Sequence, residues 1–322
     1  LMNEIEADVA GDPARDHRIG VIAGVAAYGL WGFFPIYFHL LAPTSPVEIL
    51  CHRILWSLAV MAVVLAWRRD GAWIRSLLGR PRQLAELALA ALLIAVNWLL
   101  YVWAVEQDRV VDAALGYFIN PLVTVTLAVV VLGERLRRLQ WIAVGLGAVA
   151  VAVITVGYGE VPYVALALAV SFAGYGFLKK RVTLAPSQSL AAETAILAPV
   201  AAIAMAVMAR GNGLAFGSDP ALSALLATSG VVTAVPLVLF AASARRIPLT
   251  MLGLLQYLTP TLQFLCGVLI FDEPMSATRW VGFGLVWAAL TFMSVDAVGR
   301  LRAGERLQDS DEAVVAATPD LG

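Results

Sequence analysis

The sequence predicts an all-α integral membrane protein with ten transmembrane helices, arranged as two inverted five-helix repeats. Three observations predict this fold: ten long apolar runs, the distribution of positive charge between them, and an internal repeat. The chain of 322 residues is 61% hydrophobic and only 14% charged, which is far more apolar than a typical soluble domain. A bilayer core about 30 Å thick needs roughly 20 apolar residues per helix, so the chain is long enough for ten spans.

Each predicted span is an apolar run bounded by charged or turn-forming residues. In chain order, the runs cover residues 19–41, 47–67, 84–105, 111–132, 139–157, 161–178, 190–209, 221–244, 249–271 and 280–297.

The positive charges test this assignment independently, because cytoplasmic loops are enriched in Lys and Arg. With the N-terminus inside, all but four of the 22 Lys and Arg residues fall in cytoplasmic segments, and the exceptions are Arg53, Arg109, Arg210 and Arg279. A miscounted helix would break this alternation downstream. We therefore expect a multi-pass membrane protein with both termini in the cytoplasm.

The fourth and fifth spans repeat as the ninth and tenth. The segment that starts at Leu115 aligns without gaps on the segment that starts at Leu254, at a constant offset of 139 residues. The pairs that match are Leu115 with Leu254, Pro121 with Pro260, Glu134 with Glu273, Trp141 with Trp280 and Gly145 with Gly284. Each repeat has five spans, which is an odd number, so the second copy enters the membrane from the opposite side. This architecture is common among secondary transporters.

This symmetry divides the chain into four parts. We predict a cytoplasmic N-terminal tail (1–18), a first five-helix repeat (19–157), a second, inverted repeat (161–297) and a cytoplasmic C-terminal tail (300–322).

Several function classes are disfavoured. The net charge is −1 and the basic residues are spread over many loops, so the chain lacks the concentrated basic surface that nucleic acid requires. We find no metal-ligand spacing, no nucleotide-binding loop and no nucleophile motif, so we expect no cofactor and no catalytic residues. The expected partners are a small-molecule solute and membrane lipid. The oligomeric state is left open.

The second span opens with three ionisable residues, Glu48, His52 and Arg53. Ionisable groups inside a span are costly and are therefore functional candidates. In one interpretation, Arg53 binds an anionic group of the solute and His52 is a titratable gate. In the other, all three lie at the outer interface, where they reach toward water or pair with Glu106.

The third span carries Asn97, Trp98 and Tyr101, with Asn97 and Tyr101 on one helical face. A buried Asn must find hydrogen-bond partners, so it either joins neighbouring helices or binds a solute. In the second case, aromatic side chains would line the solute's site. These are Trp98, Tyr101, Tyr28, Trp31 and Tyr175.

Pro121 and Pro260 lie within the fourth and ninth spans, where proline removes a backbone donor and breaks the helix. We predict hinges at both positions and either a central binding site or simple packing kinks around them. The polar residues nearby are Tyr117, Asn120, Gln256, Tyr257 and Gln263, and the first four are the ones that we assign to solute binding.

Four carboxylates stand near the ends of spans. Glu48 and Glu193, together with His52, are the residues we would assign to proton coupling, if transport uses it. Glu134 and Glu273 follow the fourth and ninth spans, where we expect each carboxylate to accept hydrogen bonds from neighbouring loop donors.

Five strings carry a family resemblance: HRILWS from His52, NWLLYVWAV from Asn97, LGYFINPLV from Leu115, LGERLRRLQW from Leu132 and QYLTPTLQFL from Gln256. With the internal repeat, they make the sequence similar to the RarD proteins, which are EamA-type permeases of the drug/metabolite transporter superfamily. The resemblance covers residues 20–296. It implies ten helices in the inner membrane with both termini inside, and a transport function. The family name is associated with chloramphenicol, and relatives in the superfamily export amino acids and other metabolites.

Three function classes follow. The leading hypothesis is a secondary transporter for a small amphipathic metabolite or drug that works by alternating access. The alternative is a non-transporting membrane protein, such as a sensor or an assembly partner, whose polar groups serve packing only. An intramembrane enzyme is disfavoured by the missing catalytic motifs.

Overall fold

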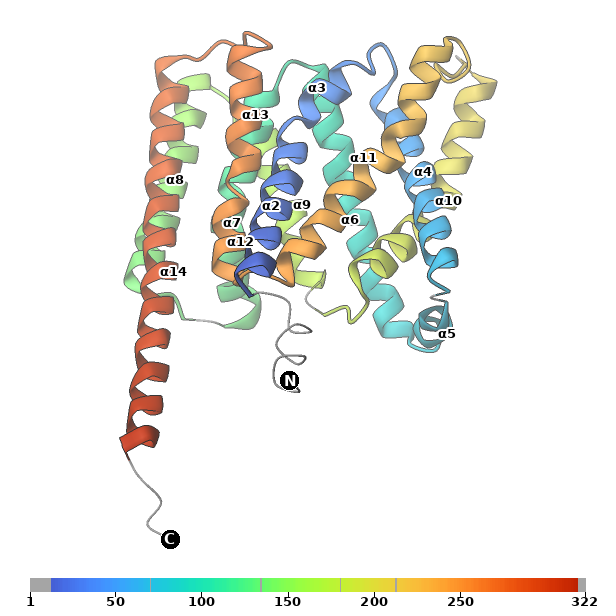
Figure 1. The fold of residues 1–322 in the computed structure, drawn as a ribbon. Coiled ribbons are helices and arrows are strands. Elements are labelled where there is room, and N and C mark those ends of the chain that lie inside the picture. Colours follow the sequence, from blue (N-terminus) through green and yellow to red (C-terminus); the bar gives the residue numbers. More distant parts are fainter. Residues whose placement is uncertain (1–12, 70, 134, 180, 212, 318–322) are drawn as a thin grey trace. The chain divides into compact units, whose positions relative to one another are not determined.

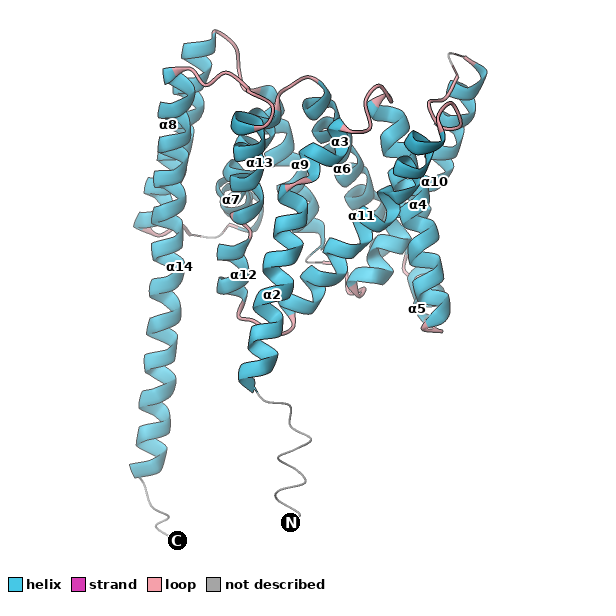
Figure 2. Ribbon diagram, turned by 45° about the horizontal axis from the view of Figure 1, so that its top comes forward, coloured by secondary structure: helices cyan, strands magenta, loops and turns pink. Residues whose placement is uncertain are grey.

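Helices make up the regular structure of the chain, which confirms the predicted all-α class. The structure is a computed structural model that describes residues 13–69, 71–133, 135–179, 181–211 and 213–317. Glu134, which the repeat pairs with Glu273, lies outside these residues. Figure 2 shows helices joined by loops, with no strand anywhere in the described segments.

Nine spans in the described part of the chain are long and apolar enough to cross a bilayer. The sixth predicted span corresponds to a shorter apolar helix, Tyr163–Lys179. The count of ten transmembrane helices therefore stays a prediction. The helices are α2 (Pro13–Gly32), α3 (Phe34–His39), α4 (Pro46–Trp67), α5 (Ala72–Leu78), α6 (Pro81–Glu106), α7 (Val110–Leu132), α8 (Arg138–Tyr158), α9 (Tyr163–Lys179), α10 (Pro186–Arg210), α11 (Pro220–Ala244), α12 (Leu249–Leu255), α13 (Leu258–Leu269) and α14 (Ala277–Ala317).

The helices extend into both predicted tails. α2 begins at Pro13, so residues 13–18 are already helical, and α14 continues past residue 300 to Ala317. The apolar pattern locates a span, but a helix can continue into water for as long as its backbone hydrogen bonds are made.

Proline marks the start of several helices because it has no backbone N–H to leave unpaired in the first turn. α4 begins at Pro46 after Ser45, whose hydroxyl accepts a hydrogen bond from the Glu48 N–H. α11 begins at Pro220 after Asp219, which caps the next two N–H groups. The Ser45 cap sets the start of α4, and the Asp219 cap sets the end of the loop between α10 and α11.

Two spans are interrupted. The first is divided into α2 and α3 at Phe33, where Pro35 cannot bond the Trp31 carbonyl and the Gln263 amide donates to it instead at 3.2 Å. The ninth is divided into α12 and α13 at Gln256, the residue four before Pro260, in agreement with the predicted break. α7, by contrast, continues through Pro121 as one helix, so the predicted break is absent there. A hinge role for either proline stays a prediction.

The chain forms two units, described here separately. One comprises Leu1–Leu127 and Pro162–Met275, and the other comprises Ala128–Val161 and Ser276–Gly322. In the first unit, α4 packs against α10 and α11, α6 against α9, and α2 against α11 and α13 (Figure 1). In the second unit, α8 packs against α14.

Candidate functional site

Three buried ionisable residues occupy the first two turns of α4. Glu48, His52 and Arg53 are each only 4% exposed. The interpretation that places them at the interface with their polar ends in water therefore does not hold. None of them forms an ion pair with Glu106 in the part of the chain that the structure describes. All three polar groups are held inside the protein.

Arg53 lies among aromatic rings. Its guanidinium carbon is 4.1 Å from the centre of the Trp98 ring on α6 and 5.3 and 5.5 Å from the rings of Phe38 and Phe34 on α3. Its Nε donates to the Thr233 hydroxyl on α11 at 3.0 Å. No carboxylate among the described residues lies within ion-pair distance of this guanidinium. Arg53 is thus a buried cation without a counter-ion in the described chain.

A glycine brings α11 close enough for this contact. A β-carbon added at Gly230 would lie 2.4 Å from the Trp56 carbonyl carbon, so α11 touches the backbone of α4 there. Thr233 follows Gly230 by three residues and faces the same way, so it reaches Arg53, which precedes Trp56 by three. Only glycine permits this approach without a shift of one helix.

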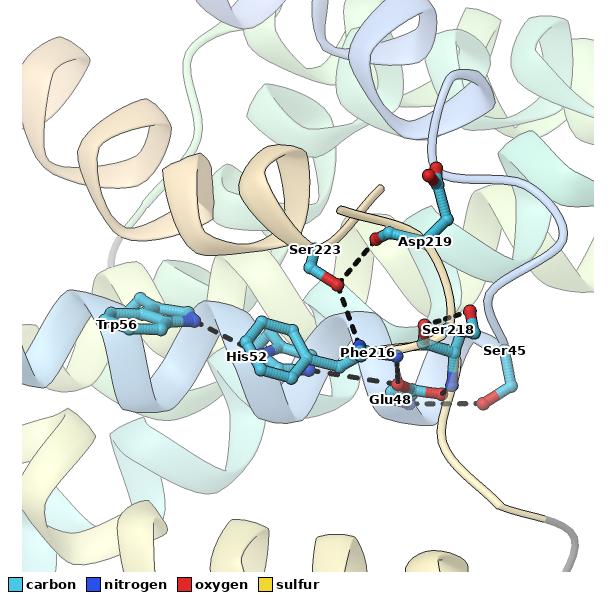
Figure 3. A network of polar contacts seen from close by, with 10 residues as sticks. Ser45, Glu48, His52, Trp56, Phe216, Ser218, Asp219 and Ser223 are labelled. Atoms are coloured by element: carbon cyan, nitrogen blue, oxygen red, sulfur yellow. Dashed lines mark hydrogen bonds and ion pairs between the residues drawn. The ribbon is translucent and has the colours of Figure 1, made fainter. Parts of the chain in front are cut away.

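Glu48 and His52 belong to a different environment, shown in Figure 3. The Glu48 carboxylate accepts hydrogen bonds from the backbone N–H groups of Ala215 and Phe216, in the loop before α11, at 3.1 and 2.9 Å. The His52 Nδ1 accepts from the Trp56 indole at 3.2 Å, which assigns the proton of the neutral ring to Nε2. This Nε2 lies 3.9 Å from the Glu48 carboxylate, and the His52 ring packs on Phe216 at 4.7 Å.

The structure therefore separates two residues that are adjacent in sequence. His52 contacts Glu48 and the loop before α11, whereas Arg53 contacts the rings on α3 and α6. A difference of one residue rotates a side chain about 100° round a helix, which is enough to divide the predicted group into two sites.

Asn97 joins three helices. Its Nδ2 donates to the Leu168 carbonyl and to the Ser171 hydroxyl on α9, both at 3.1 Å, and its Oδ1 accepts from the Tyr117 hydroxyl on α7 at 3.2 Å. Asn120 makes a similar bond to the Ala169 carbonyl at 3.1 Å. These contacts favour the interpretation in which Asn97 holds helices together, because both ends of its amide are satisfied within the protein.

Tyr101 differs from its neighbours. It is 3% exposed, and its hydroxyl has no hydrogen-bond partner among the described residues. Its ring contacts those of Phe38 and Tyr117, with centres 5.9 and 5.8 Å apart. A buried hydroxyl without a partner is costly, and Tyr101 shares this state with Ser57 on α4 and Ser229 on α11.

Glu193 is already paired. Its carboxylate lies 2.7 Å from the Lys179 amine and also accepts from the hydroxyls of Ser189 and Tyr175, at 2.9 and 3.2 Å. Tyr175, which the sequence suggested as a lining residue of the solute's site, is thus bonded to Glu193. The sequence did not reveal Lys179 as a partner, because loop charge alone assigned that residue to the cytoplasmic surface.

Glu273 accepts hydrogen bonds from the backbone N–H groups of Val110 and Val111, the latter at 2.9 Å. These groups begin α7 and have no partner within that helix. The prediction of a hydrogen-bonded end-of-helix carboxylate is therefore confirmed for Glu273, with donors in the first turn of another helix in place of the predicted loop donors.

The two remaining predicted residues lie where α12 meets α13. The Gln256 side chain is exposed and the Tyr257 side chain is partly buried. Neither is among the contacts of Arg53. The residues that the structure does bring to Arg53, and that the sequence analysis missed, are Thr233, Phe34 and Phe38. No sequence signal distinguishes these phenylalanines from lipid-facing ones. The described residues include no group of three side chains able to hold a metal ion.

Comparison with known proteins agrees with this architecture. The profile of the EamA-like transporter family matches residues 18–156 and again residues 162–295. Protein RarD from Streptomyces exfoliatus is 48% identical over 306 residues, covering 95% of this chain and 97% of that protein. Protein RarD from Escherichia coli (strain K12) is 41% identical over 286 residues, covering 88% and 97%. An uncharacterized transporter from Vibrio cholerae is 39% identical over 297 residues, covering 91% and 97%.

A solved crystal structure shares the fold. It superposes with a TM-score of 0.57 at 18% sequence identity and covers 85% of this chain and 96% of the other. At this identity the similarity concerns the fold alone, and the assignment to a family rests on the sequence comparisons. The chain is thus a multi-pass membrane protein that belongs to the EamA-like transporter family, as a permease of the RarD type.

Proposed function

We propose that this permease is a secondary transporter that moves a small amphipathic metabolite or drug across the inner membrane, and that Arg53 binds an anionic group of that solute. The observation that carries the proposal is the burial of Arg53 among aromatic rings without a carboxylate partner in the described chain. A charge within a membrane helix is costly, reaching about 2.5–3.5 kcal/mol at the centre on insertion scales, and Arg53 lies in the second turn of α4, short of that centre. Cation–π contacts return about 0.5–2 kcal/mol. An anionic ligand would supply the remaining compensation.

Alternating access between two inverted halves is the mechanism we propose. The family profile matches the chain twice, in segments close to the two predicted repeats. The helix contacts agree with a symmetric pairing: α6 of the first half packs against α9 of the second, and α11 of the second packs against α2 of the first. Both termini would then face the cytoplasm, in accord with the loop charges.

The other predicted residues keep their roles as proposals. Around Arg53, the solute would contact Trp98, Tyr101 and Tyr117. His52 and Asn97 remain proposed binding residues. Asn120, Gln256 and Tyr257 would contribute from the segments around the proposed hinges, Pro121 and Pro260. If a proton is coupled to transport, Glu48, His52 and Glu193 would carry it. Among the described residues, the Nε2 of His52 has no hydrogen-bond partner, so this nitrogen is available for proton exchange.

The test is counterflow in proteoliposomes with purified protein, a panel of radiolabelled amino acids and chloramphenicol, and the Arg53→Ala variant. We expect saturable exchange of at least one solute that Arg53→Ala abolishes while the variant still inserts and folds. Full exchange by Arg53→Ala would remove Arg53 from the site. No exchange by folded protein over this panel and the probes of the next section would favour the alternative, a non-transporting sensor or assembly partner with the same fold.

A further inference from the structure

We infer that the solute is an aromatic or branched apolar monocarboxylate without a cationic group, bound through Arg53 and the Tyr101 hydroxyl. This inference rests on the proposed transport function and names the substrate class of the same site. It follows from the charges near Arg53, from the hydrogen-bond donors that the protein leaves unused there, and from the surfaces around them.

The balance of charge favours a single negative charge. The hydroxyl groups of Tyr37, Tyr101 and Tyr117 lie near the guanidinium of Arg53, and no second cation stacks on the rings of Phe34, Phe38 or Trp98 in the described part of the chain. One buried cation compensates one anionic charge. A phosphate monoester, with nearly two negative charges at neutral pH, would leave about one of them uncompensated in an apolar environment.

The hydrogen-bond donors near Arg53 that have no partner in the protein indicate which kind of anionic group would fit. The Tyr37 hydroxyl donates to the Leu225 carbonyl at 2.9 Å, and the Tyr117 hydroxyl donates to Asn97. The Tyr101 hydroxyl has no partner, and the guanidinium of Arg53 makes only its Nε bond to Thr233 among the described residues. The planar guanidinium and one further hydroxyl donor suit the two coplanar oxygens of a carboxylate.

The surroundings are apolar and aromatic. Phe34, Phe38 and Trp98 stand around the guanidinium, and the Tyr101 and Tyr117 rings continue this surface. Such a surface gains free energy by covering an aromatic or branched hydrocarbon group. Its few free donors would satisfy one carboxylate and not the many hydroxyl groups of a sugar.

An ammonium group beside Arg53 finds no carboxylate within ion-pair distance in the described chain, and Glu106, whose Oε1 has no hydrogen-bond partner, lies just over two turns beyond Trp98 on α6. The nearest carboxylate along α4 is Glu48, and both of its oxygens already accept backbone N–H groups, from Ala215 and Phe216. The Glu193 carboxylate is paired with Lys179. A zwitterionic amino acid would therefore bury its ammonium beside the Arg53 guanidinium without an anionic partner. The site should prefer an N-acylated amino acid to the free amino acid.

Three probes with one aromatic ring separate these cases: N-acetyl-L-phenylalanine, which is a monoanion at pH 7.5; L-phenylalanine, which is a zwitterion; and N-acetyl-L-phenylalaninamide, which is neutral. Counterflow of each would be measured in proteoliposomes, with protein-free liposomes to subtract passive permeation. We expect saturable exchange of the monoanion, with a half-saturation concentration at least about tenfold below that of either relative.

Two variants test whether the Tyr101 hydroxyl binds the carboxylate of the solute. Tyr101→Phe removes one oxygen and keeps the ring, so it should insert normally and raise the half-saturation concentration for the monoanion severalfold. Tyr101→Phe should leave the half-saturation concentration for the neutral amide unchanged. Tyr163→Phe is the matched control, because Tyr163 is exposed at the start of α9 and takes no part in the proposed site.

The outcomes distinguish this inference from the proposed function. Equal or better exchange of L-phenylalanine or of the amide would overturn the substrate class and leave transport standing. Exchange of chloramphenicol and of no carboxylate would likewise overturn the substrate class and leave transport standing. No saturable exchange of any solute by folded protein would overturn both. Exchange of the monoanion with no effect of Tyr101→Phe would remove the hydroxyl from the proposal.

Discussion

The guanidinium carbon of Arg53 stacks 4.1 Å from the centre of the Trp98 ring, the closest of its aromatic contacts. The two side chains come from α4 and α6, so the contact exists only in the folded protein. An Arg stacked in this way keeps its N–H donors available for hydrogen bonds in the plane of the guanidinium. The indole therefore supports the cation while leaving its donors free for a ligand.

We predict that Trp98→Leu weakens solute binding, because it removes the strongest cation–π contact and one wall of the site. A loss of about 0.5–2 kcal/mol corresponds to a rise in apparent Michaelis constant of roughly 2- to 30-fold. Counterflow kinetics would measure it. Trp67→Leu is the control, since Trp67 at the end of α4 is 87% exposed, and a rise of similar size there would point to a general effect of tryptophan loss.

Glu48 holds the loop before α11 through two backbone hydrogen bonds. In Glu48→Gln, one acceptor oxygen is replaced by an amide nitrogen and the charge is lost, so the bonds to Ala215 and Phe216 should weaken by about 1.5–3 kcal/mol. We expect faster hydrogen exchange at these two amides by about tenfold or more, measured by mass spectrometry on peptides from this loop.

Glu86→Gln provides the comparison for Glu48, because the ion pairs of Glu86 among the described residues are with the exposed side chains of Arg82 and Arg181. It should leave exchange in the loop unchanged. Unaltered exchange in Glu48→Gln would show that the loop is held by other contacts, such as the packing of Phe216 on His52.

Lys179 neutralises the buried carboxylate of Glu193. We predict that Lys179→Met lowers the free energy of unfolding by about 1–3 kcal/mol, because it leaves a charge that is 2% exposed without a cation. The loss is moderated because Ser189 and Tyr175 still donate to the carboxylate. The double variant Lys179→Met, Glu193→Met should recover part of it. Denaturant titration in detergent would measure each variant.

Arg181→Met is the matched control for Lys179→Met. Arg181 pairs with Glu86 at 3.6 Å on an exposed surface, so its removal should cost less than about 1 kcal/mol. If the double variant were less stable than Lys179→Met alone, the carboxylate would be stabilised mainly by its hydroxyl donors rather than by the lysine.

The close approach of α11 to α4 should not tolerate a side chain at Gly230. A β-carbon there would lie 2.4 Å from the Trp56 carbonyl carbon, so Gly230→Ala must separate the helices. We expect a loss of about 1–3 kcal/mol in unfolding free energy and a weaker hold of Thr233 on Arg53.

Gly29→Ala is the control for Gly230→Ala, because nothing lies within 4 Å of an added β-carbon at this helical position. There the better helix propensity of alanine should make the change neutral or stabilising. Thermal unfolding of both variants in the same detergent measures the difference. Equal stability of the two would show that α11 can shift without cost.

The sequence by itself determined the helical class and the places of the spans, because a bilayer requires long apolar helices and admits few charges between their ends. It also identified Arg53, His52 and Glu48 as unusual, since ionisable residues inside a span stand out from any apolar background. The break near Pro260 was predictable for the same kind of reason, as proline removes a backbone donor. These are local properties of the chain, readable from composition and spacing.

Only the tertiary structure decided what each buried polar group contacts. Arg53 meets Thr233 and Trp98 through packing between helices distant in sequence, and spacing along one helix does not encode such partners. The same holds for the Glu193 pair with Lys179 and for the division of His52 from Arg53. Even the continuity of α7 through Pro121 was decided at this level. A proline is tolerated within a membrane helix where the surrounding helices supply partners for the freed carbonyl, and those neighbours exist only once the chain has folded.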